Sequence, residues 1–243
     1  MIERIISLGK KILPSRVQAT LKQRTYFWWH PYVGESPGVR LHLGCGDVSF
    51  PGYINIDLPP SDHVVGSGSG AEMYADVRHL PFHNGSVAEI QAHHIFEHFS
   101  RTAALKLLIH WYELLESGGS IVIATPDLPK TAKRANSRKA SVEERMAALR
   151  HIFGSQEADW AYHLDGWSRW KWELILPKFG FGSLRFREYS SNKMDNIVVK
   201  ATKLNAIRTR EELVENSIAL IKLSAPSPDH PLAIAWVEQF INE

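Results

Sequence analysis

The chain has 243 residues, 44% of them hydrophobic, which is enough to build one sizeable core. Its 28 basic and 26 acidic side chains leave a net charge of +2, too small to indicate nucleic-acid binding by itself. The single cysteine, Cys45, excludes an internal disulfide framework and a cysteine-based zinc site. No apolar run approaches the roughly 20 residues that span a bilayer, and no signal sequence is apparent, so we expect a cytoplasmic protein.

Residues 1–38 are predicted to form an N-terminal arm. Isoleucine and leucine are interspersed with lysine and arginine over 1–24, a composition typical of short basic amphipathic helices. Such a helix packs on its own domain or lies on an anionic membrane surface, and the sequence leaves both open. The aromatic cluster at 26–29 fits either role.

From residue 39 onwards, strand-like and helix-like segments alternate, which predicts an α/β fold. Strands are predicted at 39–43, 53–57, 72–75, 87–92, 119–125, 183–189 and 196–203. The clearest helix follows a Ser100 cap and is expected to end at Gly118 and Gly119. We expect a mostly parallel sheet with an antiparallel edge and helices on both faces.

The sheet-forming domain is predicted to cover 39–204, with an insertion at 126–182. A C-terminal extension, 205–243, contains two predicted helices at 209–223 and 231–241. Within the insertion, 130–139 carries five basic side chains and no acid. This segment is either a solvated helix face or a patch for an anionic ligand or membrane.

The turn after the first strand indicates a nucleoside-bearing cofactor. Gly44 and Gly46 allow the backbone to approach a ligand, and Asp57, at the end of the next strand, can accept hydrogen bonds from two ribose hydroxyls. Only ten residues separate Gly46 from Asp57, so a turn at 49–52 is predicted in place of a crossover helix. This spacing argues against a dinucleotide fold, which needs about 20 residues there.

Five motifs in this order resemble class I S-adenosylmethionine-dependent methyltransferases over roughly residues 39–203. They are Leu-His-Leu-Gly-Cys-Gly at 41–46, Asp57, Ala-Asp-Val at 75–77, His-His-Ile-Phe-Glu-His at 93–98 and Leu-Glu-Ser-Gly-Gly at 115–119. Within that superfamily, the chain looks most like small bacterial proteins encoded among genes for cell-surface polysaccharide synthesis. The resemblance implies a Rossmann-like fold and S-adenosyl-L-methionine as cofactor.

The same resemblance implies which residues hold the cofactor. The glycine turn would pass beneath its methionine part, Asp57 would bind the ribose, and Asp76 with the Val77 amide would bind adenine, although Asp76 could instead cap the next segment. The predicted cofactor-binding residues are Leu43, Gly44, Cys45, Gly46, Asp57, Leu58, Asp76, Val77 and His94. Many relatives carry an acid where this chain has His42.

The predicted catalytic residues are His163, His94 and Glu97. His163, in the insertion, is the preferred general base because an imidazole titrates near neutrality, although a structural hydrogen bond would explain it equally. Glu97 and His98 act directly or fix the loop by hydrogen bonds. No metal site is predicted, because a strand followed by a turn would direct His93 and its histidine neighbours away from one another.

The predicted function is O-methylation of a sugar or glycan-linked acceptor, with tryptophan and tyrosine rings at 160–172 available for stacking or for ordinary packing. Contact with the inner face of a membrane through the N-terminal arm is a further expectation. One alternative is a non-catalytic, cofactor-binding partner protein. A nucleic-acid methyltransferase is disfavoured by the modest charge and by the lack of an Asn/Asp-Pro-Pro-aromatic motif after the fourth strand, so no nucleic-acid partner is expected.

Overall fold

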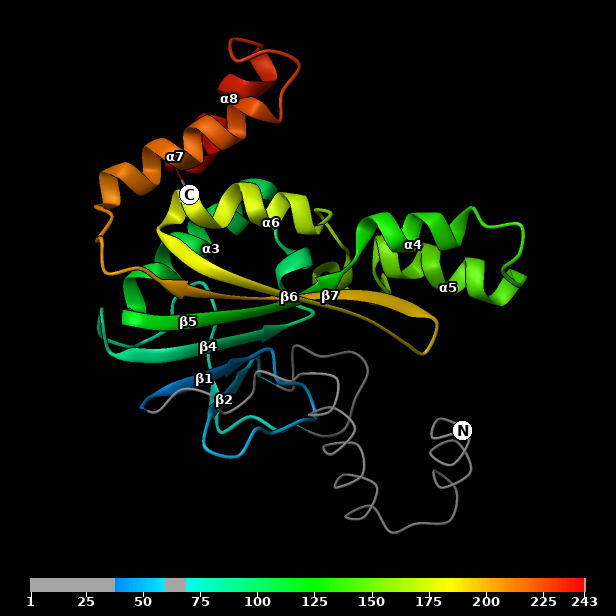
Figure 1. Cartoon of the computed structure of the whole chain (residues 1–243), viewed down its shortest axis with the longest axis horizontal. Coiled ribbons are helices and arrows are strands. Elements are labelled where there is room, and N and C mark those ends of the chain that lie inside the picture. Colours follow the sequence, from blue (N-terminus) through cyan, green and yellow to red (C-terminus); the bar gives the residue numbers. More distant parts are fainter. Residues whose placement is uncertain (1–37, 60–68, 243) are drawn as a thin grey trace.

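A computed structural model describes residues 38–59 and 69–242. Seven strands form one sheet in the order β3-β2-β1-β4-β5-β7-β6 (Figure 1). The strands are β1 Arg40–Leu43, β2 Ile54–Asp57, β3 Met73–Tyr74, β4 Val87–His93, β5 Leu115–Pro126, β6 Phe181–Ser191 and β7 Met194–Lys203. All seven predicted strands are therefore present. The predicted N-terminal arm lies outside the described residues except for Gly38.

The sheet is parallel from β3 through β5 and antiparallel beyond it. Strand β7 runs antiparallel to β5, and β6, the edge strand, runs antiparallel to β7. This arrangement confirms the predicted mixed sheet with an antiparallel edge. The carboxyl ends of the parallel strands therefore meet at one end of the sheet, where ligands bind in open α/β folds.

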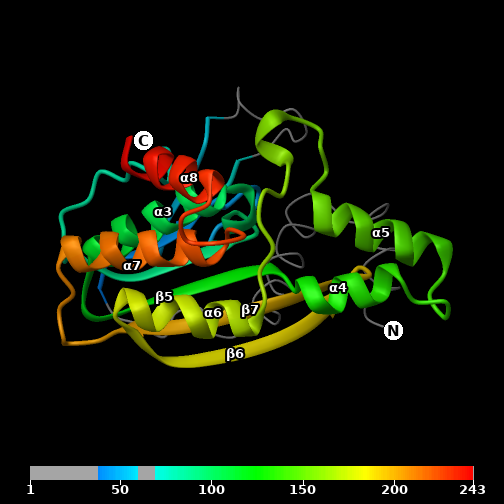
Figure 2. The same ribbon diagram turned by 90° about the horizontal axis from the view of Figure 1, so that it is seen from above.

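Helices cover one face of the sheet, as Figures 1 and 2 show. These helices are α3 Arg101–Leu114, α6 Arg169–Ile175, α7 Arg210–Leu223 and α8 Pro231–Asn242. A second pair, α4 Leu128–Ala135 and α5 Val142–Phe153, follows the carboxyl end of β5. The described residues thus show sheet-covering helices on one of the two faces where they were predicted. None of the helices in these described ranges is long and apolar enough to cross a bilayer.

Helix α3 begins where the sequence predicted, because the Ser100 hydroxyl accepts a hydrogen bond from the Ala103 amide. It ends earlier than predicted. The last helical residue is Leu114, and Leu115 already pairs with Val87 of β4, so the strand begins before the two glycines. Gly118, with φ +80°, lies within β5 as a left-handed position rather than as the end of the helix.

The two faces of the sheet differ in chemistry. The helix-covered face forms the main apolar core, which includes Phe96, Trp111 and Trp172. The opposite face carries buried polar residues on alternate positions of its strands, among them His42, Glu89, Gln91, His93 and Lys200. Glu89 is central there, since it pairs with Lys200 Nζ at 3.0 Å and accepts hydrogen bonds from Gln91 at 2.7 Å and from Tyr53. Pairing offsets the cost of burying these groups.

The predicted turn between β1 and β2 is present, and His42 supports it. Phe50 stacks on the His42 ring with 3.7 Å between ring centroids. Asn55 joins the two segments, because its Oδ1 accepts from His42 Nδ1 at 3.0 Å and from the Phe50 amide at 2.7 Å. His42, which replaces the acid of many relatives, therefore holds the short crossover in place.

Burial determines how His42 responds to pH. It lowers the pKa of His42 to about 4, while the hydrogen bond with Asn55 acts in the opposite direction. The unfolded chain binds this proton below pH 6.5 and the folded chain only below about pH 4. The contribution of neutral His42 to the free energy of unfolding is therefore complete above pH 6.5 and falls as the pH is lowered toward 4.

We expect the titration of His42 to lower the free energy of unfolding at pH 5 by about 2 kcal/mol relative to its value at pH 7. Urea unfolding of wild type and His42→Gln at both pH values measures this cost, because glutamine keeps a donor for Asn55 but does not titrate. His83→Gln, which changes an exposed histidine, is the control. Equal pH dependence in wild type and His42→Gln would contradict the prediction.

Candidate functional site

The glycine turn and Asp57 meet at the carboxyl end of the sheet. Asp57 Oδ2 accepts a hydrogen bond from the Gly46 amide at 2.6 Å, and Oδ1 accepts one from the Leu58 amide at 2.7 Å. The Cys45 amide also donates to the Ile56 carbonyl at 3.2 Å. The structure therefore brings together two segments that the sequence assigned to one binding site.

The two glycines of the turn have different surroundings. Both lie in the left-handed region, with φ +61° at Gly44 and +56° at Gly46. A Cβ at Gly44 would lie 2.1 Å from Cγ2 of Ile95, whereas a Cβ at Gly46 would meet no atom of the described residues within 4 Å. Gly44 is thus required by packing inside the protein, and Gly46 borders open space that a ligand can enter.

The side chains of two other predicted cofactor residues are unsuited to ligand contact. Leu43 is fully buried in the apolar core, so any part it takes is limited to its backbone. Burial, and secondarily the charge of Asp57, raises the pKa of the Cys45 thiol to about 12. This thiol stays protonated at neutral pH and is not a nucleophile.

Asp76 and Val77 follow β3, the outer strand of the parallel part. The Asp76 carboxylate already accepts two bonds from the Arg78 side chain, at 2.6 Å from Nη2 and 3.0 Å from Nε, and one from the Arg78 amide at 2.9 Å. Burial raises the pKa of Asp76 and these bonds lower it, with a net lowering. The Val77 carbonyl accepts from Trp111 Nε1 at 3.2 Å. No residue in the described ranges accepts a hydrogen bond from the Val77 amide.

His94 lies directly after β4 in a strained conformation. Its φ is +56°, a value that non-glycine residues rarely adopt and that is found preferentially at functional sites. The imidazole Nδ1 lies 3.2 Å from Oε1 of Glu97, and 36% of the side chain is exposed. Since a carboxylate only accepts, Nδ1 carries the proton and Nε2 of neutral His94 carries the lone pair.

The loop after α5 brings His163 to Glu97. The Leu164 amide donates to the Glu97 carbonyl at 2.8 Å, which fixes the loop against the short helix η2, Phe96–His98. His163 Nε2 then lies 4.0 Å from Glu97 Oε1, and its Nδ1 lies 3.0 Å from the His151 carbonyl. The three predicted catalytic residues are therefore adjacent, with Glu97 in the middle.

The sequence missed two further histidines in this cluster. His98 packs edge-on against His163, with ring centroids 4.7 Å apart, and its Nδ1 lies 3.0 Å from the Tyr162 carbonyl. His151, on α5, lies 6.4 Å from His163 by ring centroids and hydrogen-bonds Asn196 at 3.0 Å. The sequence assigned His98 either a direct role or a loop-fixing one without placing it beside His163, and a lone histidine in the helix pattern of α5 gives no signal of its own.

Burial and the neighbouring groups set the charges of the cluster. Burial lowers the pKa of His151 to about 4, and it also lowers the pKa of His163. Burial of Glu97 acts to raise its pKa, but the hydrogen bond from His94 and the nearby histidine charges bring it below its ordinary value. At neutral pH, the cluster therefore combines the buried Glu97 carboxylate with neutral rings at His151 and His163.

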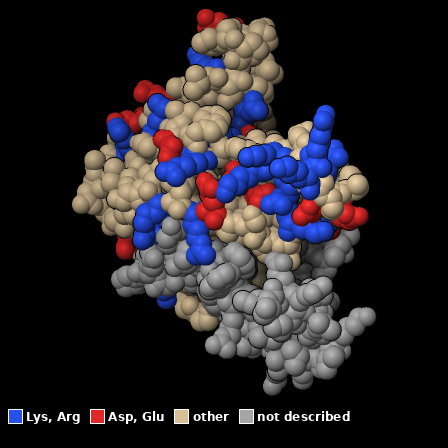
Figure 3. Space-filling model, turned by 45° about the vertical axis from the view of Figure 1, so that its right-hand side comes forward, with Lys and Arg blue, Asp and Glu red and all other residues tan. Residues whose placement is uncertain are grey.

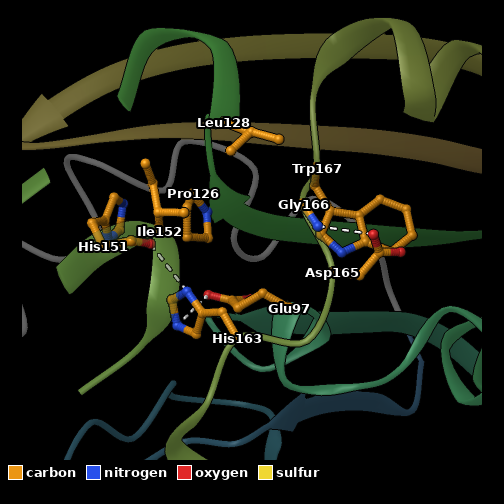
Figure 4. A pocket seen from close by; sticks show the side chains of 9 residues that line it. All are labelled: Glu97, Pro126, Leu128, His151, Ile152, His163, Asp165, Gly166 and Trp167. Carbon is orange, nitrogen blue, oxygen red and sulfur yellow. Dashed lines mark hydrogen bonds and ion pairs between the residues drawn. The ribbon is translucent and has the colours of Figure 1, made fainter. Parts of the chain in front are cut away.

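A small pocket adjoins this cluster (Figure 4). It is lined by Glu97, Pro126, Leu128, His151, Ile152, His163, Asp165, Gly166 and Trp167. Figure 4 shows Glu97 and His163 pointing toward one another, from η2 and from the loop. Trp167 and Trp172 stack on each other with centroids 4.1 Å apart and lie within the apolar core, so these two predicted sugar-stacking rings are packing residues.

The basic segment at 130–139 is partly neutralised. Lys130 forms an ion pair with Glu188, and Arg134 binds Asp195 through Nε at 2.6 Å and Nη2 at 2.7 Å. Lys133, Arg138 and Lys139 are exposed. Figure 3 shows lysine and arginine side chains gathered, with acidic ones among them, on the side of the molecule that faces the viewer. Contacts with Glu188 of β6 and Asp195 of β7 therefore engage Lys130 and Arg134.

No protein-family model and no curated protein sequence matches the chain. Solved structures do match. The chain is similar to a SAM-dependent methyltransferase from Archaeoglobus fulgidus, at 14% identity and a TM-score of 0.50, over 82% of this chain and 99% of the other. A protein from Pyrococcus horikoshii is similar at 14% identity and a TM-score of 0.50, over 79% and 93% of the two chains.

A third similar structure is a chain of the Haloferax volcanii complex between the Trm112 methyltransferase activator and the protein described as a methyltransferase. The identity is 10% and the TM-score 0.52, over 80% of this chain and 96% of the other. Identities this low establish a shared fold and not a shared activity. The chain therefore has the Rossmann-like fold of class I methyltransferases, as the sequence predicted.

Proposed function

We propose that the chain is an S-adenosylmethionine-dependent methyltransferase that acts on an oxygen of a sugar or glycan-linked acceptor. The observation that carries the proposal is the meeting of Gly46 and Asp57 at the carboxyl end of the sheet, beside the point where the strand order reverses. The similar Archaeoglobus protein is itself described as a SAM-dependent methyltransferase, which supports the choice of cofactor.

The residues of this end of the sheet fit the cofactor. The Asp57 carboxylate, whose oxygens accept from the Gly46 and Leu58 amides, is an acceptor of the kind that ribose hydroxyls need. The open space at Gly46 allows a ligand to approach the backbone. We assign adenine recognition first to the Val77 amide, because the Asp76 carboxylate is already engaged by Arg78.

Methyl transfer to a hydroxyl requires a base for the acceptor's proton. When bound, the cofactor supplies a methyl group on a positively charged sulfur, which the acceptor oxygen attacks in line while the carbon–sulfur electron pair stays on sulfur. We assign the proton to Nε2 of His94, which Glu97 orients through Nδ1. The greater exposure of His94, 36% against 11% for His163, supports this choice over the base that the sequence favoured.

Exposed aromatic rings on the acceptor side support a sugar as the substrate. Trp160, Tyr162 and Trp170 are 38%, 42% and 64% exposed, and Tyr162 directly precedes His163. Aromatic faces of this kind pack against the apolar face of sugar rings. A place in cell-surface polysaccharide synthesis and a peripheral contact with the membrane belong to the same proposal and rest on the sequence resemblance.

Replacement of Asp57 should weaken S-adenosylmethionine binding. We expect Asp57→Ala to lower the affinity roughly 10- to 100-fold, because hydrogen bonds to a charged group contribute about 1.5–3 kcal/mol. Asp57→Asn, which keeps one acceptor oxygen, should lose less affinity than Asp57→Ala. Calorimetric titration gives the affinities, and a thermal unfolding curve of each variant controls for the lost bond to the Gly46 amide. Unchanged affinity in Asp57→Ala would remove Asp57 from the site.

Alanine at the two glycines of the turn should separate folding from binding. Gly44→Ala must displace Ile95, so we expect a loss of about 2–4 kcal/mol in unfolding free energy. Gly46→Ala has only the left-handed φ to accommodate, which costs about 1–2 kcal/mol, yet it should lose cofactor binding. Urea unfolding and calorimetry measure the two effects. Native affinity in Gly46→Ala would show that the ligand does not use the open space.

The acceptor class is tested by mass spectrometry of surface glycans from cells with and without this protein. We expect one glycan to lose the mass of a methylene group when the protein is absent. Purified protein incubated with that unmethylated glycan should convert S-adenosylmethionine to S-adenosylhomocysteine. Unchanged glycans would overturn the sugar assignment, and cofactor binding without turnover would favour the non-catalytic alternative.

A further inference from the structure

The Glu97 carboxylate is buried and only half satisfied. Its side chain is 2% exposed, and Oε1 accepts from His94. Oε2 has no hydrogen-bond partner among the described residues. An unpaired buried oxygen of an ionised carboxylate costs several kcal/mol, so such an atom calls for a proton donor or a cation.

The imidazole of His163 faces Glu97, but the neutral ring cannot donate a hydrogen bond to the Glu97 carboxylate. His163 Nδ1 lies 3.0 Å from the His151 carbonyl, which only accepts, so the ring proton is on Nδ1 and the lone pair is on Nε2. That Nε2 lies 4.0 Å from Glu97 Oε1. The two atoms are too far apart for a hydrogen bond, and both are electron-rich.

His98 repeats the arrangement of His163. Its Nδ1 lies 3.0 Å from the Tyr162 carbonyl, so its lone pair is also on Nε2. Glu97, His98 and His163 each offer one ligand atom, and these three atoms lie within 4.8 Å of one another. Three electron-pair donors thus converge on one small volume, and the backbone carbonyls of Tyr162 and His151 orient the two histidines.

We propose that Glu97, His98 and His163 bind a divalent transition-metal cation of the Zn²⁺ type. Two imidazoles and one carboxylate form a ligand set that suits zinc and its neighbours, whereas Mg²⁺ prefers oxygen ligands alone. Metal-binding histidines commonly donate their second ring N–H to a backbone carbonyl, as both histidines do here. The cation would also balance the charge of the buried Glu97 carboxylate.

Binding requires a contraction of the cluster, whose three ligand atoms lie within 4.8 Å of one another. Metal–ligand bonds of about 2.0–2.1 Å in a tetrahedral site place ligand atoms about 3.4 Å apart. The 4.0 Å between Nε2 of His163 and Oε1 of Glu97 must therefore close by roughly 0.6 Å. The Leu164 amide bond to the Glu97 carbonyl holds the two backbones together, so we assign this closure to the side chains.

Three protein ligands leave a fourth position for a substrate oxygen. A bound cation lowers the pKa of an oxygen that it coordinates, so an acceptor hydroxyl there would give up its proton to His94 more readily. This role rests on the proposed methyl transfer, whereas the cation site itself does not. It also gives His163 a ligand role in place of the general-base role that the sequence favoured.

The sequence-based expectation of no metal site weighed Glu97 with His93, His94 and His98, and it did not include His163. His93 indeed points away, because its Nε2 hydrogen-bonds Gln91 at 2.8 Å on the opposite face of the sheet. The missing ligand, His163, comes from a distant part of the chain. Only the contact between its loop and η2 brings it to Glu97 and His98.

The test is titration of the full-length, chelator-treated protein with Co²⁺, followed by visible absorption, and with Zn²⁺, followed by calorimetry. We expect one equivalent of each to bind, with Mg²⁺ binding much more weakly. His98→Asn and His163→Asn should each lower the Zn²⁺ affinity at least tenfold, whereas His83→Asn, at an exposed site apart from the cluster, should not change it.

The titrations can either support the proposed metal site or overturn it. Zn²⁺ affinity that is unchanged in both His98→Asn and His163→Asn, or the absence of binding by wild type, overturns the site. A circular dichroism spectrum confirms that each variant is folded, and the half-exposed His98 gives a usable variant even where His163→Asn does not fold. Because no cofactor or acceptor is present, failure here is distinguishable from failure of the methyltransferase proposal, which the Asp57 titration tests.

Discussion

The contact between Gly44 and Ile95 joins the two halves of the candidate site. Ile95 occupies the space that a side chain at position 44 would take, so the turn after β1 lies directly against the segment after β4. Strands β1 and β4 are neighbours at the point where the strand order reverses, which is where open α/β sheets bind ligands. The lack of a Cβ at Gly44 therefore sets how closely the glycine turn approaches the segment that carries the histidine cluster.

The cluster itself depends on a second long-range contact. The loop between α5 and α6 is fixed at one end by the pairing of Gly154 with Tyr162 and at the other by that of Asp127 with Trp167. Between these bridges, the Leu164 amide bonds the Glu97 carbonyl, so His163 has little freedom. Glu97 is thus surrounded by groups from the residue after β4, from η2 and from this loop, and its charge is held away from water, where its interactions are strong.

The sequence predicted those parts of the structure that local patterns determine. Strand periodicity, the Ser100 cap and the short spacing before Asp57 each reflect interactions within a few residues, and the structure confirms them. The sequence failed where contacts between distant segments decide. Early pairing of Leu115 with Val87 ends α3, and His98 meets His163 across a long loop. No periodicity encodes such meetings, because they depend on how loops dock.

The adjacent residues His93 and His94 show how one change in backbone conformation gives neighbouring histidines different surroundings. Along a strand, side chains alternate between faces, and His93, the last residue of β4, joins the buried polar network with Gln91. At His94, the backbone turns to φ +56°, which ends the alternation and directs the imidazole to Glu97. A left-handed histidine costs about 1–3 kcal/mol. Such strain persists where the surrounding structure holds it, and here it places a partly exposed imidazole beside a buried carboxylate.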